Sequence, residues 1–129
     1  FVSSPDDPGE DLADARARWA RADLTSYIWT VDRACFCAGF GAAEIRVEDG
    51  EKVSVERVDQ GSIPPEEAEF WPTVDELFEI VERAIQEAGA LEVDYDTATG
   101  APLFVDIDWI ANAIDDEVRY TATPPVAVD

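Results

Sequence analysis

Apolar side chains recur at helical spacing near the start of the chain. Residues 11–23 contain no Gly or Pro, and Leu12, Ala15, Trp19 and Ala22 follow one another every three or four positions. This period predicts an amphipathic helix over 11–23. The preceding stretch is mostly polar, so we expect a flexible lead-in over 1–10.

A period of two begins after this helix. Residues 25–37 are rich in β-branched and aromatic side chains, and their alternation predicts a strand. Residues 42–58, AAEIRVEDGEKVSVERV, alternate apolar and charged positions on both sides of Asp49-Gly50. Because this dipeptide readily adopts the positive φ angles of a tight turn, we expect a hairpin with Val53 and Val55 on its return strand. One face of the 25–37 strand carries Tyr27, Trp29, Val31, Cys35 and Cys37, and the other carries Thr30 and Asp32.

A loop over 60–72 separates this hairpin from a second helix. Thr73 is a candidate N-cap, and Glu76 stands three residues later, which is the pattern of a capping box. An apolar stripe follows, and Gly89 is expected to end the helix. The stripe consists of Val74, Leu77, Phe78, Val81, Ala84 and Ile85.

The last third of the chain returns to strand patterns. LEVDYD, a TATG turn and PLFVDIDW predict a second hairpin over 91–109, a connection covers 110–116, and EVRYTAT predicts a last strand. The order α-β-β-β-α-β-β-β predicts a two-layer α+β domain over 11–129, with helices on one face of an antiparallel sheet. The two halves share this order, which hints at an internal duplication. The last strand should turn Val118, Tyr120 and Ala122 inward.

The charge of the chain is strongly negative. Thirty Asp and Glu stand against nine Lys and Arg, giving a net charge of −21, and Lys52 is the only lysine. Such a surface repels phosphate backbones and anionic membranes, so we expect no nucleic-acid partner. Adaptation to high salt and a GC-rich genome both explain an acidic, arginine-rich chain, and an acidic face for cations or a basic partner is a third explanation. No apolar run is long enough to insert into a membrane.

The only two cysteines, Cys35 and Cys37, flank Phe36. On a flat strand their Cα atoms would stand about 6.6 Å apart, near the upper limit for a disulfide, so a bond between them needs a bulge or a turn. The alternatives are two reduced, buried side chains, a redox pair without the usual Cys-X-X-Cys spacing, or a metal clip that lacks further thiol or imidazole ligands.

Carboxylates gather on the second hairpin. Asp94, Asp96, Asp106 and Asp108 alternate with inward apolar residues, so they should share an outer face, with Asp115 and Asp116 just beyond it. A solvated acidic face is the simpler interpretation, because these groups repel one another across strands. The alternative is a Ca²⁺ site built from these six residues, although no segment matches an EF-hand loop.

The residues that usually carry catalysis are scarce. The chain contains no histidine, the commonest general base, and GFGAAE lacks the lysine and the spacing of a phosphate-binding loop. We therefore expect neither enzymatic activity nor a cofactor. Trp71, in the 60–72 loop, is the tryptophan that we expect to be most exposed and the best single candidate for a partner contact, but we favour packing of Phe70 or Trp71 on Phe78 as a hydrophobic staple.

Several segments together resemble one family. ARARW, SYIWTV, CFC, FWPTVDELF, YDTATGAP and VDIDWIANAIDDEVRY are similar to domain of unknown function family 6174, over about residues 15–123. The resemblance implies small exported bacterial proteins, often lipoproteins, and hence a cell-envelope location with a possible lipid anchor on a removed N-terminus. An oxidising location favours a disulfide between Cys35 and Cys37. The resemblance implies no particular activity.

Together these features predict an exported, non-enzymatic binding or structural module of the cell envelope. Its partner would be an unidentified protein or small ligand. A module that binds Ca²⁺ through the outer carboxylates of the second hairpin is the alternative.

Overall fold

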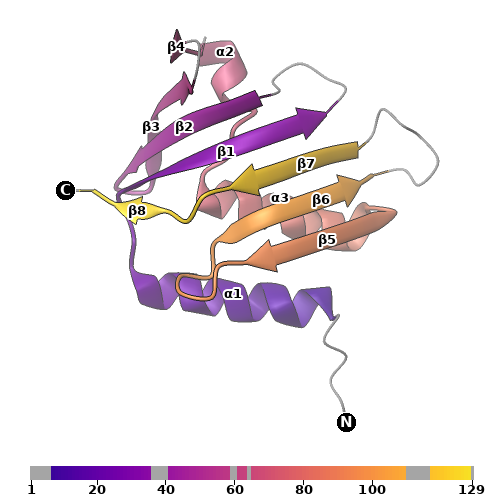
Figure 1. The fold of residues 1–129 in the computed structure, drawn as a ribbon. Coiled ribbons are helices and arrows are strands. Elements are labelled where there is room, and N and C mark those ends of the chain that lie inside the picture. The colour runs from indigo at the N-terminus through magenta and orange to yellow at the C-terminus, as the bar shows by residue number, and fades with distance from the viewer. Residues whose placement is uncertain (1–6, 36–40, 59–60, 64, 110–116, 129) are drawn as a thin grey trace.

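The computed structural model describes residues 7–35, 41–58, 61–63, 65–109 and 117–128. The order of the main elements confirms the predicted α-β-β-β-α-β-β-β arrangement, to which β4, α2 and β8 are short additions (Figure 1). The helices are α1 (Pro8–Ala22), α2 (Pro65–Ala68) and α3 (Val74–Glu87). The strands are β1 (Tyr27–Cys35), β2 (Gly41–Glu48), β3 (Glu51–Arg57), β4 (Gly61–Ser62), β5 (Ala90–Tyr95), β6 (Pro102–Asp108), β7 (Glu117–Ala122) and β8 (Val126–Ala127).

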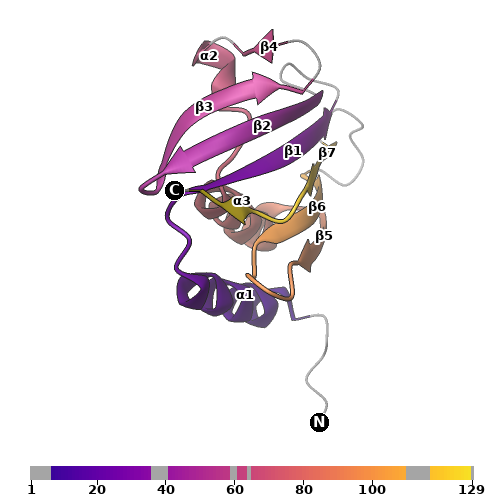
Figure 2. The same ribbon diagram turned by 60° about the vertical axis from the view of Figure 1, so that its left-hand side comes forward.

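The strands form one antiparallel sheet in the order β4-β3-β2-β1-β7-β6-β5, and β8 pairs with the start of β1. Each half of the chain supplies a three-stranded meander, and β1 joins β7 at the centre of the sheet. Helices α1 and α3 lie on the same side of the sheet and contact each other (Figures 1 and 2). The predicted two-layer α+β fold is therefore confirmed, and none of the described helices covers the opposite face of the sheet.

The core lies between the sheet and the two long helices. Inward side chains of the central strands are fully buried, as at Trp29, Ile45 and Val105, because strand alternation points every second residue at the helices. The predicted stripe of α3 fills the other side of this layer. Its buried members are Val74, Leu77, Phe78, Val81 and Ala84.

Helix α1 starts earlier than the sequence pattern suggests. The predicted lead-in over 1–10 is wrong for its last three residues, since the helix begins at Pro8. Asp7 is the N-cap, and its carboxylate accepts hydrogen bonds from the backbone N–H groups of Gly9 and Glu10. Proline suits the first turn of a helix because the N–H group that it lacks has no partner there.

Helix α3 begins as predicted and ends differently. The Thr73 hydroxyl accepts from the Glu76 N–H at 3.1 Å, and the Glu76 carboxylate accepts from the Thr73 N–H at 2.9 Å, which is the predicted capping box. The helix ends at Glu87, and its C-cap, Ala88, is extended. Gly89 lacks the positive φ angle of a left-handed cap, and its N–H group donates to the carbonyl of Asp108 on β6.

The segment predicted as a plain loop over 60–72 contains structure. Strand β4 pairs with the end of β3, and the single helical turn α2 follows. Pattern reasoning missed both elements because each is too short to show a period. The predicted connection over 110–116 lies outside the described residues.

The first hairpin turns at Asp49 and Gly50, which have φ angles of 52° and 81° as predicted. A β-bulge follows the turn: Arg46 faces Ser54 and Val47 faces Lys52, so Val53 has no cross-strand partner. The bulge reverses the alternation of β3, because the extra residue shifts all side chains before it to the opposite face. Val53 is consequently 50% exposed, and Lys52 points inward beside the buried Val47.

The second hairpin turns through Asp96 to Ala101. Asp96 accepts from the hydroxyl of Thr99 and from the N–H of Ala98, and Gly100 has a φ angle of 87°. Val118 and Tyr120 on the last strand are buried as predicted.

No helix among the residues described here combines the length and the apolarity needed to span a bilayer.

Candidate functional site

The carboxylates of the second hairpin share an outer face only in part. Asp106 and Asp108 lie on β6, and Asp94 faces Phe104 across the β5–β6 pair. Asp96 has left the strand and belongs to the turn. Asp106 forms an ion pair with Arg119 at 3.0 Å, so part of the acidic face is neutralised by the neighbouring strand.

The described residues do not form the predicted calcium site. They contain no group of three or more acidic, cysteine or histidine side chains that could hold a metal ion. Asp108 faces another acid, Glu117, and one of its carboxylate oxygens is buried without a hydrogen-bond partner. The other two predicted ligands, Asp115 and Asp116, lie outside the described residues, so the structure does not test the six-residue set as a whole.

Cys35 lines a hollow of about 310 Å³ where β1 ends and β7 begins, beside Asp106 of β6. Its sulfur accepts a hydrogen bond from Arg33 Nη1 at 3.4 Å, and the Arg33 guanidinium lies over the rings of Phe70 and Tyr120, 5.0 and 5.8 Å from their centroids. No free thiol occurs in the described part of the chain. Cys37 lies outside it, so the disulfide stays a prediction.

Trp71 is fully buried, so its predicted role as an exposed partner contact is wrong. Its indole N–H donates to the Gly41 carbonyl at 3.0 Å, and the Arg57 guanidinium lies 5.5 Å from its ring centroid. The segment that contains it is short and lacks a period, and for that reason the sequence pattern placed it in an exposed loop. Trp71 therefore anchors the segment before α3 to the sheet.

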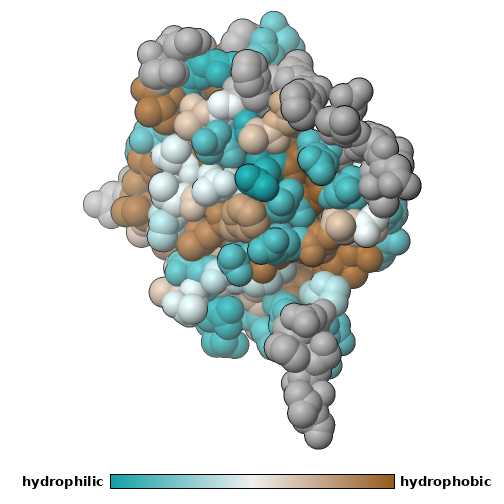
Figure 3. Space-filling model, turned by 45° about the vertical axis from the view of Figure 1, so that its right-hand side comes forward, coloured by the Kyte–Doolittle hydropathy of each residue, from teal (hydrophilic) through white to brown (hydrophobic). Residues whose placement is uncertain are grey.

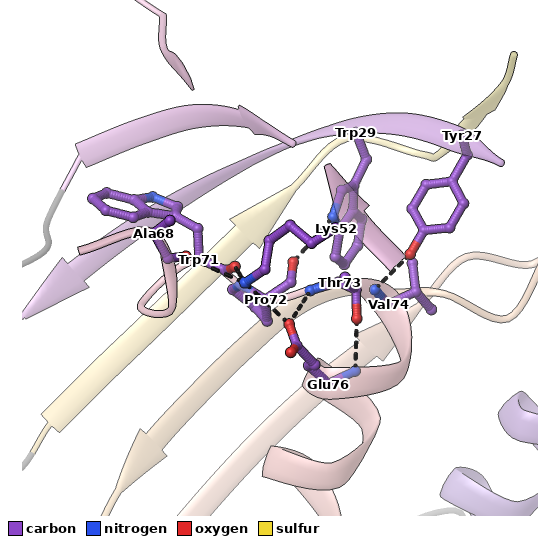
Figure 4. A network of polar contacts seen from close by, with 9 residues as sticks. All are labelled: Tyr27, Trp29, Lys52, Ala68, Trp71, Pro72, Thr73, Val74 and Glu76. Atoms are coloured by element: carbon purple, nitrogen blue, oxygen red, sulfur yellow. Dashed lines mark hydrogen bonds and ion pairs between the residues drawn. The ribbon is translucent and has the colours of Figure 1, made fainter. Parts of the chain in front are cut away.

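Side chains from β1 and β3 hold the backbone that leads into α3 (Figure 4). Lys52 Nζ donates to the carbonyls of Ala68 and Trp71 at 3.2 and 2.6 Å and lies 3.2 Å from a Glu76 carboxylate oxygen. Trp29 donates its indole N–H to the Pro72 carbonyl at 3.2 Å. We call this set, with Tyr27 and Thr73, the α3 clamp. Sequence reasoning predicted only the Thr73–Glu76 capping box within it, and the one signal for the rest was a single lysine in an arginine-rich chain.

Tyr27 completes the clamp. Its hydroxyl oxygen accepts from the Val74 N–H at 2.8 Å, which satisfies one of the unpaired donors in the first turn of α3. Burial is the main cause that raises the pKa of Tyr27 well above its ordinary value of 10.0, and Asp75 and Glu76 add to the effect. The clamp is thus a structural network that fixes the start of α3.

A groove of about 490 Å³ runs beside β5, the edge strand at the other side of the sheet. The inward residues of this strand are only half-buried, whereas Val105 and Ile107 on the neighbouring β6 are completely buried. Figure 3 turns this side of the molecule forward and shows brown hydrophobic residues among teal hydrophilic ones. The lining consists of Pro8, Asp11, Val81, Leu91, Glu92, Val93, Asp94 and Tyr95.

Tyr95 closes one end of the β5 groove. Its ring stacks on Phe78 with centroids 6.4 Å apart. The pKa of Tyr95 is raised to about 12, mainly by burial and in part by the Asp11 carboxylate, while Arg16 opposes the shift.

The sequence profile of a family of unknown function, DUF6174, matches residues 11–124. This match confirms the resemblance that the sequence segments suggested. No curated protein and no solved structure matches the chain.

Proposed function

Since the chain belongs to DUF6174, a family of unknown function, we propose its role from its surface: it is a non-enzymatic binding module that uses β5 and the adjoining groove. One observation carries this proposal. Leu91, Val93 and Tyr95 turn toward the core side of the sheet and pack against the core, but they stay only half-buried and line a groove together with residues of α1 and α3. Half-covered apolar side chains around a concave surface are typical of ligand sites.

The backbone of β5 adds to this surface. Within the described part of the sheet β5 pairs with β6 alone, and it is six residues long. An edge strand offers N–H and C=O groups that the sheet does not use, and an extended segment can pair with them. Side chains of such a segment would alternate between the groove and the open face of the sheet. The groove and the strand edge therefore suit an extended peptide.

The pKa values also support binding without catalysis. Burial raises the pKa values of Tyr27 and Tyr95, which moves them further from neutral pH. General acid–base catalysis works best with a pKa near the working pH, so these two groups are poorly matched to it. Both hydroxyls are better explained by packing.

A selection from a random hexapeptide library tests the binding surface. We expect selected peptides to protect the amides of β5 from hydrogen exchange and to lose affinity for Leu91→Asn, because that change places a polar side chain in the groove. Ile85→Asn is the matched control, since Ile85 is also half-buried but lines a different hollow between α1 and α3. Protection away from β5, or equal losses in the two variants, would contradict the proposal.

The proposal includes an exported location with a disulfide between Cys35 and Cys37. The family resemblance supports it, because members are similar to small exported proteins and oxidising compartments preserve disulfides. Mass measurement after alkylation without reductant tests the bond, and we expect no label until a reductant is added. Two labelled thiols before reduction would exclude the disulfide.

A further inference from the structure

The charges around the β5 groove decide which kind of peptide fits it. Three carboxylates, Asp11, Glu92 and Asp94, belong to its lining, and no basic side chain among the described residues does. All three are exposed, and the whole chain carries a net charge of −21. A cationic segment would therefore be attracted over a distance and then held by local pairs.

Glu92 and Asp94 are placed to pair with an added strand. They lie on the outer face of β5, where Glu92 faces Asp106 and Asp94 faces Phe104 on β6. Strand β6 contains no Lys or Arg, and Arg119 on β7 is already paired with Asp106. Residues directly opposite on paired strands stand about 5 Å apart, close enough for ion pairs. An added strand with basic residues on its outer face would supply the missing partners.

A second copy of this chain fits the same edge poorly. Two β5 strands pairing with each other would place Glu92 and Asp94 near the same acids of the copy. Like charges across strands are destabilising, and charged side chains on an edge strand are a known protection against self-association. The charges of the β5 edge therefore disfavour pairing with the same edge of a second copy, whereas they favour pairing with a cationic strand.

We propose that the β5 edge binds an extended partner segment in which Lys or Arg alternates with apolar residues. This inference rests on the proposed function and adds the chemistry of the partner. Apolar side chains of the segment pack on Leu91 and Val93 in the groove. Its basic side chains pair with Glu92 and Asp94 on the open face of the sheet. Backbone hydrogen bonds to β5 fix the direction and register.

The test uses the whole chain and a capped hexapeptide that alternates Lys and Val. We expect the peptide to protect β5 amides from hydrogen exchange and to bind less tightly as salt increases. The variant E92K/D94K should weaken binding by about fivefold or more, since two cross-strand ion pairs are lost. E44K/E56K is the matched control, because Glu44 and Glu56 are also exposed, face each other on β2 and β3, and change the net charge equally.

The outcomes separate the two proposals. Equal weakening in E92K/D94K and E44K/E56K would overturn the inference, because it would show that the attraction depends on net charge alone. A peptide with Thr in place of Lys that binds β5 as tightly would also overturn it, while leaving β5 as the binding surface. Failure of every peptide, including those selected from the random library, to protect β5 would overturn both. A concentration-dependent dimer with protected β5 amides would make a second copy the occupant and overturn the inference.

Discussion

The core-facing side of the sheet is well covered at its β3 end and only partly covered at its β5 end. Beside β3, the segment from Ala68 to Val74 lies against the strands, and the α3 clamp satisfies its backbone groups. Beside β5, the inward side chains are half-buried and face a groove. One end is therefore built for rigidity and the other keeps apolar surface and strand edge accessible. Binding surfaces are expected where a fold leaves such groups unused, and rigid support elsewhere keeps them in place.

Truncation of aromatic residues at the two ends should show the largest difference. Trp71→Ala should lower the free energy of unfolding by about 3–5 kcal/mol, because it empties a buried site and removes the donor to the Gly41 carbonyl. Tyr95→Ala, at the groove, should cost only about 1–2 kcal/mol, because its ring is half-exposed already. Urea denaturation followed by circular dichroism measures both. Equal losses of stability would contradict the claim that the β3 end is packed more tightly than the β5 end.

The elements of this fold could be predicted where a period or a cap was present. The capping box of Thr73 and Glu76 and the Asp49-Gly50 turn were confirmed, because each depends on residues adjacent in the sequence. The inward position of Lys52 could not be predicted, since a bulge of one residue reverses the alternation and leaves no local signal. The contacts that bury Trp71 could not be predicted for a similar reason, as its partners come from distant strands.

The arginine content also has a structural reason that composition does not reveal. Five of the eight arginines place a guanidinium over an aromatic ring, a stacking arrangement that the planar guanidinium suits better than an ammonium. High salt and codon usage remain explanations for the excess of acids. The stacked residues are Arg16, Arg33, Arg57, Arg83 and Arg119.

The groove at β5 could be predicted only as an acidic strand, because its depth depends on where α1 and α3 end.

Gly100 allows the β5–β6 turn to approach helix α1 closely. Gly100, in the β5–β6 turn, has a φ angle of 87°, and a Cβ atom there would collide with the carbonyl oxygen of Ala15 on α1. Gly100→Ala should therefore cost roughly 3 kcal/mol from backbone strain and overpacking. Gly50→Ala is the control, because Gly50 has a φ angle of 81° but open space around it, so about 1 kcal/mol is expected. Thermal or urea unfolding measures the difference, and similar costs would show that α1 does not restrain the hairpin.

The clamp at the β3 end can be weakened without emptying the core. Lys52→Met keeps the aliphatic stem but removes the ammonium that binds the carbonyls of Ala68 and Trp71, so we expect a loss of about 1–3 kcal/mol. Val53→Thr, one residue further along, should change stability by less than about 0.5 kcal/mol, because the bulge leaves that side chain exposed. Hydrogen exchange at the start of α3 should rise only in the lysine variant. The opposite ranking would mean that the bulge does not form in solution.

The smallest effect at neutral pH should come from replacing Tyr95, one of the two tyrosines that mark the two ends of the sheet. Both pKa values are raised in the folded state, to about 12 for Tyr95 and further for Tyr27. The stability that each contributes is therefore complete below about pH 10 and is lost above it, because the unfolded chain ionises first and releases protons on unfolding.

Phenylalanine variants assign this loss to the two tyrosines. Tyr95→Phe should leave the urea midpoint at pH 7 nearly unchanged and flatten its decline between pH 10 and 12. Tyr27→Phe should also flatten the decline, but it should lower stability at pH 7 by about 1–3 kcal/mol, because the Val74 N–H loses its buried acceptor. If both variants behaved alike at pH 7, the tyrosine in the clamp would be no more tightly integrated than the tyrosine at the groove.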